Sequence, residues 1–266
     1  MNAANSTRDD ALEKDPQFAS TLARGIALLQ SYRVGESVLG NKDFAERTGL
    51  SKTAVARLTH TLVALGYLRH DAALGKYRLG ASVLSMSYPL LASMQLRQIA
   101  RPLMKKLANH IHGAVSLGIR DRTQMVYIET MRSTNSLVMT PDIGATIPIM
   151  TTAIGKAWLC KAPAEERETV LNRIRVADPK QFDRHYGGIL QARKTFERNG
   201  YCSNRGEWRK DVYGFAAPLD KPVDSTLFVF NCGILARPGQ FSEIEREVAP
   251  LLVSLVRSTE VLLGLR

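Results

Sequence analysis

The sequence has few cysteines, no long apolar run and no apolar leader. Its 266 residues include three cysteines, Cys160, Cys202 and Cys232, widely spaced and without a CxxC pair. This odd number argues against a disulfide framework or a zinc ribbon, and it is typical of a reducing compartment. No apolar segment approaches the ~20 residues that a membrane helix requires. The first residues lack the apolar core of a signal peptide. We therefore expect a cytoplasmic protein without membrane contact, in which residues 1–17 form a disordered segment.

The motifs of the common enzyme classes are also missing. The chain has no HExxH, no GxSxG and no cluster of metal ligands, and its five histidines are scattered. The segment TTAIGKAWL resembles a phosphate-binding loop, but Met150 stands where the first glycine is required and Ala157 follows the Gly-Lys pair. We therefore expect no enzyme, no cofactor and no metal. A hydrolase would require a nucleophile–base pair that no motif indicates.

The chain carries an excess of positive charge, with a formal net charge of +11. A basic protein favours a polyanionic partner, although a basic enzyme is an alternative explanation. Residues 81–266 hold 25 basic against 17 acidic residues, so most of the excess lies in the C-terminal part. The overall charge therefore does not locate a nucleic-acid surface, and local motifs must do so.

Three short helical patterns precede residue 66. Apolar spacing predicts a helix over residues 20–32, a second from Asn41 to Gly49 and a third from Ser51 to about Leu65, with Asn41 and Ser51 as N-caps. Two helices that cross through a short turn need a small residue, a turn glycine and a buried aliphatic residue. Ala45, Gly49 and Val55 provide them, which predicts a helix-turn-helix.

The third helix has a polar face. Lys52, Thr53, Arg57 and His60 lie opposite Val55 and its apolar neighbours. Such side chains suit base edges and phosphates in the major groove. A solvated helix face is the alternative interpretation.

A basic hairpin follows directly. The runs GYLRH and GKYRLG, joined by DAAL, predict two paired strands that carry Arg69, Lys76 and Arg78. From Ser51 to Gly80 there are five basic residues against one acid, which suits phosphate contacts. Helix and hairpin together predict a winged helix-turn-helix that binds double-stranded operator DNA.

The remainder mixes strands and helices. A helical region over residues 82–111 contains Pro89 and Pro102, which should divide it into two helices. Strands are expected at AVSLGIR, TQMVYIETM, SLVMT, YCSNRGEW, VYGFAAPL and TLFVFNCGILA, and helices at TTAIGKAWLCK, PAEERETVLNRIR and ILQARKTFERNG. A final helix should begin at Ser242, with Glu245 completing a capping box. The expected fold class is α/β (α+β), with an antiparallel sheet flanked by helices.

The order of these segments resembles IclR-family transcriptional regulators over nearly the whole length. The resemblance is carried by FAERTGLSKTAVARLTHTLVALGYL with GKYRLG, and then by IGATIPIMTTAIGKAWL, NGYCSNRGEW and GFAAPL. It implies a winged helix-turn-helix domain at 18–80, a linker helix at 81–96 and a PAS/GAF-like effector-binding domain at 97–266. It also implies a homodimer or a tetramer built from two dimers. We expect Leu84, Tyr88, Leu91 and Met94 of the linker to pair the DNA-binding domains, because these apolar residues have no other obvious partner.

Candidate site residues follow from these patterns and from the resemblance. The DNA-binding set is Asn41, Ser51, Lys52, Thr53, Arg57, His60, Arg69, Lys76 and Arg78. The effector-binding set implied by the resemblance is Met139, Met150, Ala153, Gly155, Asn204, Arg205, Glu207, Asn231 and Cys232. An inward Arg205 would favour a carboxylate effector through a bidentate pair, whereas a surface arginine on a turn is the alternative.

We therefore expect a ligand-responsive DNA-binding transcriptional regulator that senses a small organic molecule, a carboxylate or an aromatic metabolite. The alternative is a small-molecule sensor that acts through protein–protein contacts, with the helix-turn-helix as a dimerisation module.

Overall fold

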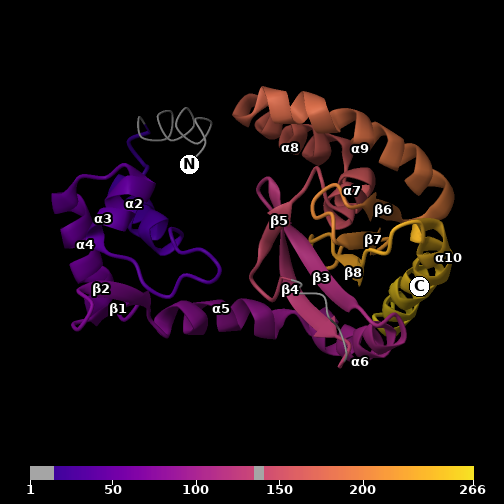
Figure 1. Ribbon diagram of the computed structural model, residues 1–266, viewed down its shortest axis with the longest axis horizontal. Coiled ribbons are helices and arrows are strands. Elements are labelled where there is room, and N and C mark those ends of the chain that lie inside the picture. The colour runs from indigo at the N-terminus through magenta and orange to yellow at the C-terminus, as the bar shows by residue number, and fades with distance from the viewer. Residues whose placement is uncertain (1–14, 135–140) are drawn as a thin grey trace. The chain divides into compact units, whose positions relative to one another are not determined.

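The computed structural model in Figure 1 describes residues 15–134 and 141–266. Within them the chain forms two compact units, the first ending at Ser93 and the second comprising Met94–Arg266.

The described residues of the first unit form three helices, a hairpin and a further helix. In order they are α2 (Ser20–Leu29), α3 (Asn41–Thr48), α4 (Lys52–Ala64), β1 (Leu68–Asp71), β2 (Lys76–Leu79) and α5 (Ser82–Ser93). Apolar residues on one face of each helix meet in a small core that includes Leu28, Phe44, Val55 and Leu62. The antiparallel hairpin packs on it through Leu68. The predicted helices and hairpin are confirmed.

The turn between α3 and α4 has the expected residues. Gly49 adopts a left-handed conformation with φ 73°, which favours glycine because it has no Cβ. Ser51 caps α4 by accepting a hydrogen bond from the Ala54 N–H at 3.2 Å. The prediction of Asn41 as the N-cap of α3 is wrong. Gly40 holds that position, because the Asp43 carboxylate accepts its N–H at 2.8 Å.

Two helices cover residues 82–110, but neither proline separates them. The break lies at Met94, between α5 and α6 (Gln95–His110), where the backbone leaves the helical region. Pro89 and Pro102 lie inside α5 and α6. Each proline removes one backbone donor, and each helix tolerates that loss without ending.

The second unit is built on one six-stranded antiparallel sheet. Its strands are β3 (Ala114–Asp121), β4 (Gln124–Arg132), β5 (Thr146–Pro148), β6 (Cys202–Arg205), β7 (Val212–Pro218) and β8 (Val229–Leu235), in the spatial order β5-β4-β3-β8-β7-β6. The remaining helices are α7 (Ala153–Lys161), α8 (Ala164–Ala177), α9 (Pro179–Asn199) and α10 (Phe241–Leu262). The expected fold class, an antiparallel sheet flanked by helices, is confirmed.

The helices cover opposite faces of this sheet. On β7, Gly214 faces Ala153 of α7, whereas the ring of Phe215 stacks on Phe241 of α10 at 5.7 Å. Successive residues of a strand point to opposite faces, so α7 and α10 lie on different sides. Figure 1 shows α8 and α9 outside α7, and α6 lies with α10. The face under α7 carries the cavity described below.

Some predicted boundaries are wrong. Helix α9 begins at Pro179, ten residues before the predicted run, because Asp178 caps it by accepting the Gln181 N–H at 2.9 Å. Helix α10 begins at Phe241 after Gln240, and it has no side-chain cap, so the Ser242–Glu245 capping box is absent. The strand predicted at SLVMT falls on residues 136–140, outside the described residues. Within the described ranges, no helix is long and apolar enough to span a membrane.

Candidate nucleic-acid interface and effector cavity

The exposed face of α4 presents the predicted polar residues. Lys52, Thr53, Arg57 and His60 are exposed, whereas Val55 is fully buried on the opposite side. In the described part of the chain, no side-chain hydrogen bond or ion pair involves Lys52, Arg57 or His60. A helix anchored by its apolar face therefore presents two cations and an imidazole to solvent, where they can reach a partner.

The hairpin beside α4 contributes further cations. Arg69 and Lys76 are exposed. Arg78 instead donates two hydrogen bonds to Asp71 within the hairpin, at 3.1 and 3.0 Å. This pair lowers the pKa of the Asp71 carboxyl. Arg78 therefore stabilises the hairpin, and Arg69 and Lys76 are its exposed positive charges.

Asn41 and Ser51 lie at the N-termini of α3 and α4. The Ser51 hydroxyl is engaged as the α4 cap. The Asn41 Oδ1 atom is buried and accepts no hydrogen bond from any described residue. Of these two predicted DNA contacts, Ser51 is exposed and also stabilises the start of α4 as its N-cap.

An ion pair ties the core of the first unit to the segment before α3. Arg47 donates to the Glu36 carboxylate at 2.6 and 2.8 Å and to the Ser31 carbonyl at 2.7 Å. The Arg47 hydrogen bond lowers the pKa of Glu36 to about 2. This contact holds α3 against the end of α2 and thereby supports the position of α4.

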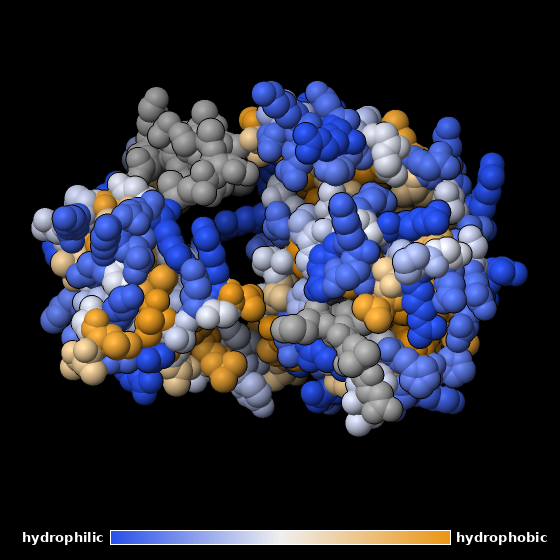
Figure 2. Space-filling view, viewed as in Figure 1, coloured by the Kyte–Doolittle hydropathy of each residue, from blue (hydrophilic) through white to orange (hydrophobic). Residues whose placement is uncertain are grey.

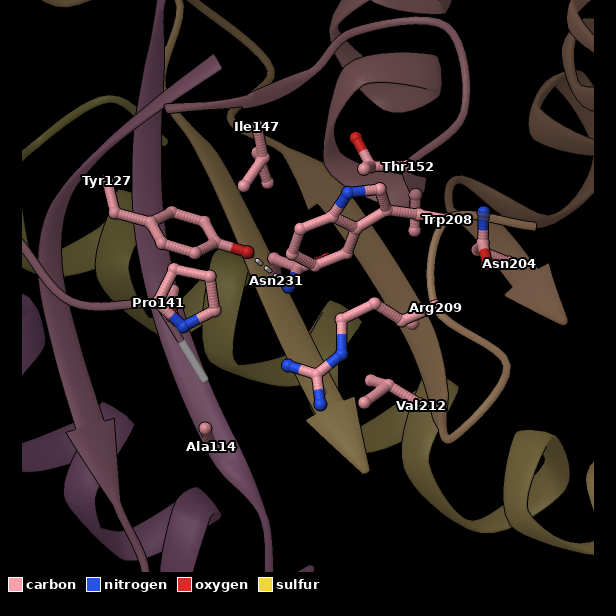
Figure 3. A pocket seen from close by; sticks show the side chains of 14 residues that line it. Ala114, Tyr127, Pro141, Ile147, Thr152, Asn204, Trp208, Arg209, Val212 and Asn231 are labelled. Carbon is pink, nitrogen blue, oxygen red and sulfur yellow. Dashed lines mark hydrogen bonds between the residues drawn. The ribbon is translucent and has the colours of Figure 1, made fainter. Parts of the chain in front are cut away.

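A cavity of about 40 Å³ opens on the α7 face of the sheet in the second unit. Figure 3 shows the rings of Tyr127 and Trp208 and the guanidinium of Arg209 converging on it. All six strands of the sheet, the start of α7 and the loop at 206–211 contribute most of its lining. That lining is formed by Ala114, Ser116, Tyr127, Pro141, Ile147, Thr152, Ala153, Asn204, Trp208, Arg209, Val212, Gly214, Asn231 and Gly233.

The floor of the cavity is polar. The Asn231 amide donates to the Tyr127 hydroxyl at 3.1 Å, drawn as a dashed line in Figure 3. Burial raises the pKa of the Tyr127 phenol, which therefore stays neutral at physiological pH. A neutral phenol can both donate and accept a hydrogen bond. Tyr127 and Asn231 therefore provide an uncharged polar pair at the base.

Asn204 shapes the loop that covers the cavity. Its Oδ1 accepts the N–H groups of Gly206 and Glu207, each at 3.0 Å, and its amide donates to the Thr151 carbonyl. These bonds turn the chain after β6 and connect it to the start of α7. They place Trp208 and Arg209 over the cavity.

Arg209 is the cation of the cavity lining. Its Nε donates to Asp211 at 3.0 Å, and a second N–H donates to the same carboxylate at 2.5 Å. Asp211 has a lowered pKa because of this contact. The guanidinium also lies 6.0 Å from the Trp208 ring centroid. A guanidinium beside an indole is suited to binding a planar anion. Such an anion would pair with Arg209 either alongside Asp211 or in place of Asp211.

Three predicted effector residues, Ala153, Asn204 and Asn231, line this cavity. Met150 belongs to the core, and Gly155 packs so tightly on the Ile149 backbone that a Cβ would lie 2.0 Å from its carbonyl oxygen. Cys232 points to the opposite face of β8, one residue along from Asn231.

Two predicted polar residues also lie away from the cavity. The Arg205 guanidinium lies 5.3 Å from the Phe241 ring centroid, on the α10 side of the sheet. Of the two alternatives for Arg205, this geometry favours a surface arginine, since Asn204 occupies the inward position of β6. Glu207 instead pairs with the buried Lys156 of α7, with both oxygens 2.6 Å from Nζ. Met139 lies outside the described residues.

Sequence reasoning missed Ser116, Tyr127, Thr152, Trp208 and Arg209. Alternation along β3 and β4 could have indicated Ser116 and Tyr127, because polar residues stand there among apolar ones. No periodic signal marks Trp208 and Arg209, which lie in an irregular loop. In the described ranges, no group of three or more His, Cys, Asp or Glu side chains could hold a metal ion.

Comparisons with known proteins agree with this two-part arrangement. The family model described as Bacterial transcriptional regulator IclR C-terminal matches residues 89–227, and the IclR helix-turn-helix domain matches residues 21–72. The HTH-type transcriptional regulator TsaQ1/TsaQ2 of Comamonas testosteroni is 32% identical, over 96% of this chain and 92% of its own length.

Solved structures give the same result. An IclR family transcriptional regulator from Brucella abortus is 37% identical, covers 94% of each chain and has a TM-score of 0.81. An IclR homolog from Microbacterium hydrocarbonoxydans, solved with 4-hydroxybenzoate, shares the fold with a TM-score of 0.62 at 22% identity, over 90% of this chain and 99% of its own. These matches confirm the prediction of a regulator rather than an enzyme. The chain belongs to the IclR family of transcriptional regulators, which bind operator DNA through a helix-turn-helix and a small-molecule effector through the C-terminal domain.

Proposed function

We propose that this regulator binds its operator as a homodimer and that its effector is a small aromatic carboxylate. The observation that carries the proposal is the convergence of Arg209, Trp208 and Tyr127 on one cavity. A guanidinium supplies paired donors for a carboxylate, and the two aromatic rings supply apolar surface for a flat ligand. The relative from Microbacterium hydrocarbonoxydans holds a ligand of this class, 4-hydroxybenzoate.

The cavity must widen to admit such a ligand. Its volume of about 40 Å³ has room for only a few water molecules. The loop at 206–211 carries Trp208 and Arg209 and is held at Asn204 and Glu207. An outward movement of this loop would open the space next to Tyr127 while the sheet stays in place.

A ligand assay with a matched neutral analogue tests the effector class. We expect benzoate or 4-hydroxybenzoate to raise the Tm and quench Trp208 fluorescence in a Trp158→Phe background, and the corresponding amides to do neither. Arg209→Gln should abolish the response, because it removes the charge that recognises the carboxylate. Arg205→Gln is the control, since that arginine faces α10. Equal responses to acid and amide, or an unchanged response of Arg209→Gln, would exclude this carboxylate site.

For the DNA interface, we propose that α4 enters the major groove through Lys52, Thr53, Arg57 and His60. The hairpin residues Arg69 and Lys76 would contact the phosphate backbone. The exposure of these side chains supports both assignments. An electrophoretic shift with the region upstream of the chain's own gene tests them. Absence of a shift at low salt would contradict the proposal and favour action through protein–protein contacts.

The homodimer rests on α5. Leu84, Met86, Tyr88 and Leu90 of this helix are exposed, and Figure 2 shows hydrophobic residues along its position in Figure 1. An apolar surface of this kind is typical of an interface between chains. Sedimentation velocity should show a dimer or a larger assembly for the native chain and a smaller species for Leu84→Asp/Tyr88→Asp. A monomeric native chain would contradict the proposal.

A further inference from the structure

Two cysteines that are far apart in the sequence meet in the second unit. The Sγ atoms of Cys160 in α7 and Cys202 in β6 lie 3.7 Å apart, and both thiols are free. Cys202 pairs in register with Ala216, which places it on the α7 face of the sheet. Cys232 pairs in register with Phe215 and therefore lies on the α10 face. The sheet thus separates the third cysteine from the pair.

The two neighbouring thiols differ in accessibility. Cys160 is partly exposed, whereas Cys202 is buried. The hydrogen bond with Cys202 and the nearby charges of Arg193 and Arg167 lower the pKa of the Cys160 thiol. The same sulfur contact and burial raise the pKa of the Cys202 thiol. An accessible thiol with thiolate character reacts with oxidants first, and a close second thiol can then resolve the product.

We propose that Cys160 and Cys202 form a redox modification site, in which a hydroperoxide converts the two thiols into an intramolecular disulfide between α7 and β6. The Cys160 thiolate attacks the O–O bond of hydrogen peroxide, giving a sulfenic acid and hydroxide. The Cys202 sulfur then attacks the Cys160 sulfur, and the sulfenic hydroxyl leaves as water with the Cys202 proton. Two thiols lose two electrons, and one peroxide gains them. A dithiol reductant reverses the change by thiol–disulfide exchange.

The bond requires only a small movement. A disulfide has an S–S distance of ~2.05 Å, so the two sulfur atoms must approach by roughly 1.6 Å. Both residues belong to elements that frame the effector cavity. Thr152 and Ala153, at the start of α7, line it, and so does Asn204, two residues after Cys202. The disulfide would therefore restrain the α7 and β6 walls of the cavity relative to one another.

Mass spectrometry of the full chain tests the site. Reduced protein is treated with equimolar hydrogen peroxide, alkylated, and mapped after proteolysis. Before alkylation, the intact oxidised chain should be lighter than the reduced chain by two hydrogens. After alkylation and proteolysis, we expect a Cys160–Cys202 linked peptide and an alkylated thiol only at Cys232, out of the three cysteines. Dithiothreitol should restore all three thiols. A linkage through Cys232, a product linked between chains, or only irreversible sulfinic acid at Cys160 would overturn the proposal.

Three single variants assign the roles. Cys232→Ser should form the disulfide like the native chain. Cys160→Ser should lose the linked peptide and leave Cys202 reduced, because its buried thiol no longer has a reactive neighbour. Cys202→Ala should accumulate a dimedone-reactive sulfenic acid at Cys160. Failure of Cys202→Ala to react with dimedone after peroxide, while it retains native circular dichroism, would remove Cys160 as the reacting thiol.

Discussion

The exposed cations of α4 and the hairpin in the first unit contrast with the buried ion pairs of the second unit. In the first, Lys52, Arg57 and Arg69 are exposed, and no described side chain pairs with them. In the second, Glu129 is buried between Arg97 and Arg101 at 3.0 Å from each, and Lys156 is buried beside Glu207. Exposed cations remain available to phosphates, whereas buried pairs hold elements in fixed positions. The first arrangement suits a large polyanion, and the second fixes α6 on the sheet and holds the loop that covers the cavity.

The largest effect is expected from breaking the buried pair near the cavity. The Lys156 side chain is 4% exposed, whereas that of Glu207 is 41% exposed. Glu207→Gln leaves a buried ammonium without its counter-charge and should lower the free energy of unfolding of the second unit by about 3 kcal/mol. Lys156→Met should cost less, because the released carboxylate is hydrated. Urea denaturation followed by tryptophan fluorescence reports on this unit, since Trp158 and Trp208 both lie in it. Equal losses of unfolding free energy in Glu207→Gln and Lys156→Met would contradict this difference between the buried ammonium and the hydrated carboxylate.

The next effect concerns an exposed cation of the first unit. Arg57→Ala should weaken operator binding by about 1–3 kcal/mol if Arg57 contacts a base. Its contribution to folding should be small, because its side chain has no partner in the described structure. The control is Arg173→Ala, which removes the same charge from an exposed position of α8. Titration by fluorescence anisotropy compares them, and an equal loss in both variants would mean that overall charge, rather than α4, determines affinity.

A smaller effect should come from the helix caps, which exist in both units. Ser51→Ala removes the hydroxyl that accepts the Ala54 N–H and should destabilise α4 by about 1 kcal/mol. Thr152→Ala is the counterpart in α7, where the buried hydroxyl accepts the Gly155 N–H and donates to the Pro148 carbonyl. We expect the Thr152 variant to lose more protection against amide hydrogen exchange in its own helix. The reverse order would show that burial does not strengthen the cap.

The smallest effect should appear at acidic pH in the first unit. The Arg47 hydrogen bond lowers the pKa of Glu36 from 4.5 to about 2. A lowered folded-state pKa stabilises the fold above pH ~4.5, and this contribution is lost as the pH falls towards 2. In Glu36→Gln, amide hydrogen exchange in α3 should depend less on pH below about 4.5, and its pH dependence above pH 6 should be unchanged. If exchange below pH 4.5 depends on pH as in the native chain, other carboxylates cause the effect.

The sequence predicted the first unit well because its determinants are local. The α3–α4 turn depends on Gly49 and Ser51, which are adjacent to it, and the polar face of α4 follows from helical periodicity. The N-cap of α3 is Gly40 rather than the predicted Asn41. Asparagine and glycine are both accepted at this position, and the hydrogen bond from the Gly40 N–H to Asp43 favours Gly40.

The cavity was harder to predict because it is assembled from distant segments. Asn231 and Cys232 are neighbours on β8, and only the register decides which of them faces the cavity. The same applies to Asn204 and Arg205 on β6. Trp208 and Arg209 lie in a loop whose path depends on the hydrogen bonds of Asn204, and no period in the sequence encodes that path.

The narrowness of the cavity has a consequence for the concentration at which the regulator responds. A ligand that binds only an open loop has an apparent Kd equal to its intrinsic Kd divided by the fraction of open molecules. The Lys156–Glu207 contact and the Asn204 turn both favour the closed loop, and Glu207 lies outside the cavity lining. With the loop opening proposed above, substitutions at Glu207 should therefore change the response threshold without altering which molecule is recognised. The proposal thus assigns sensitivity and selectivity to different residues of one loop.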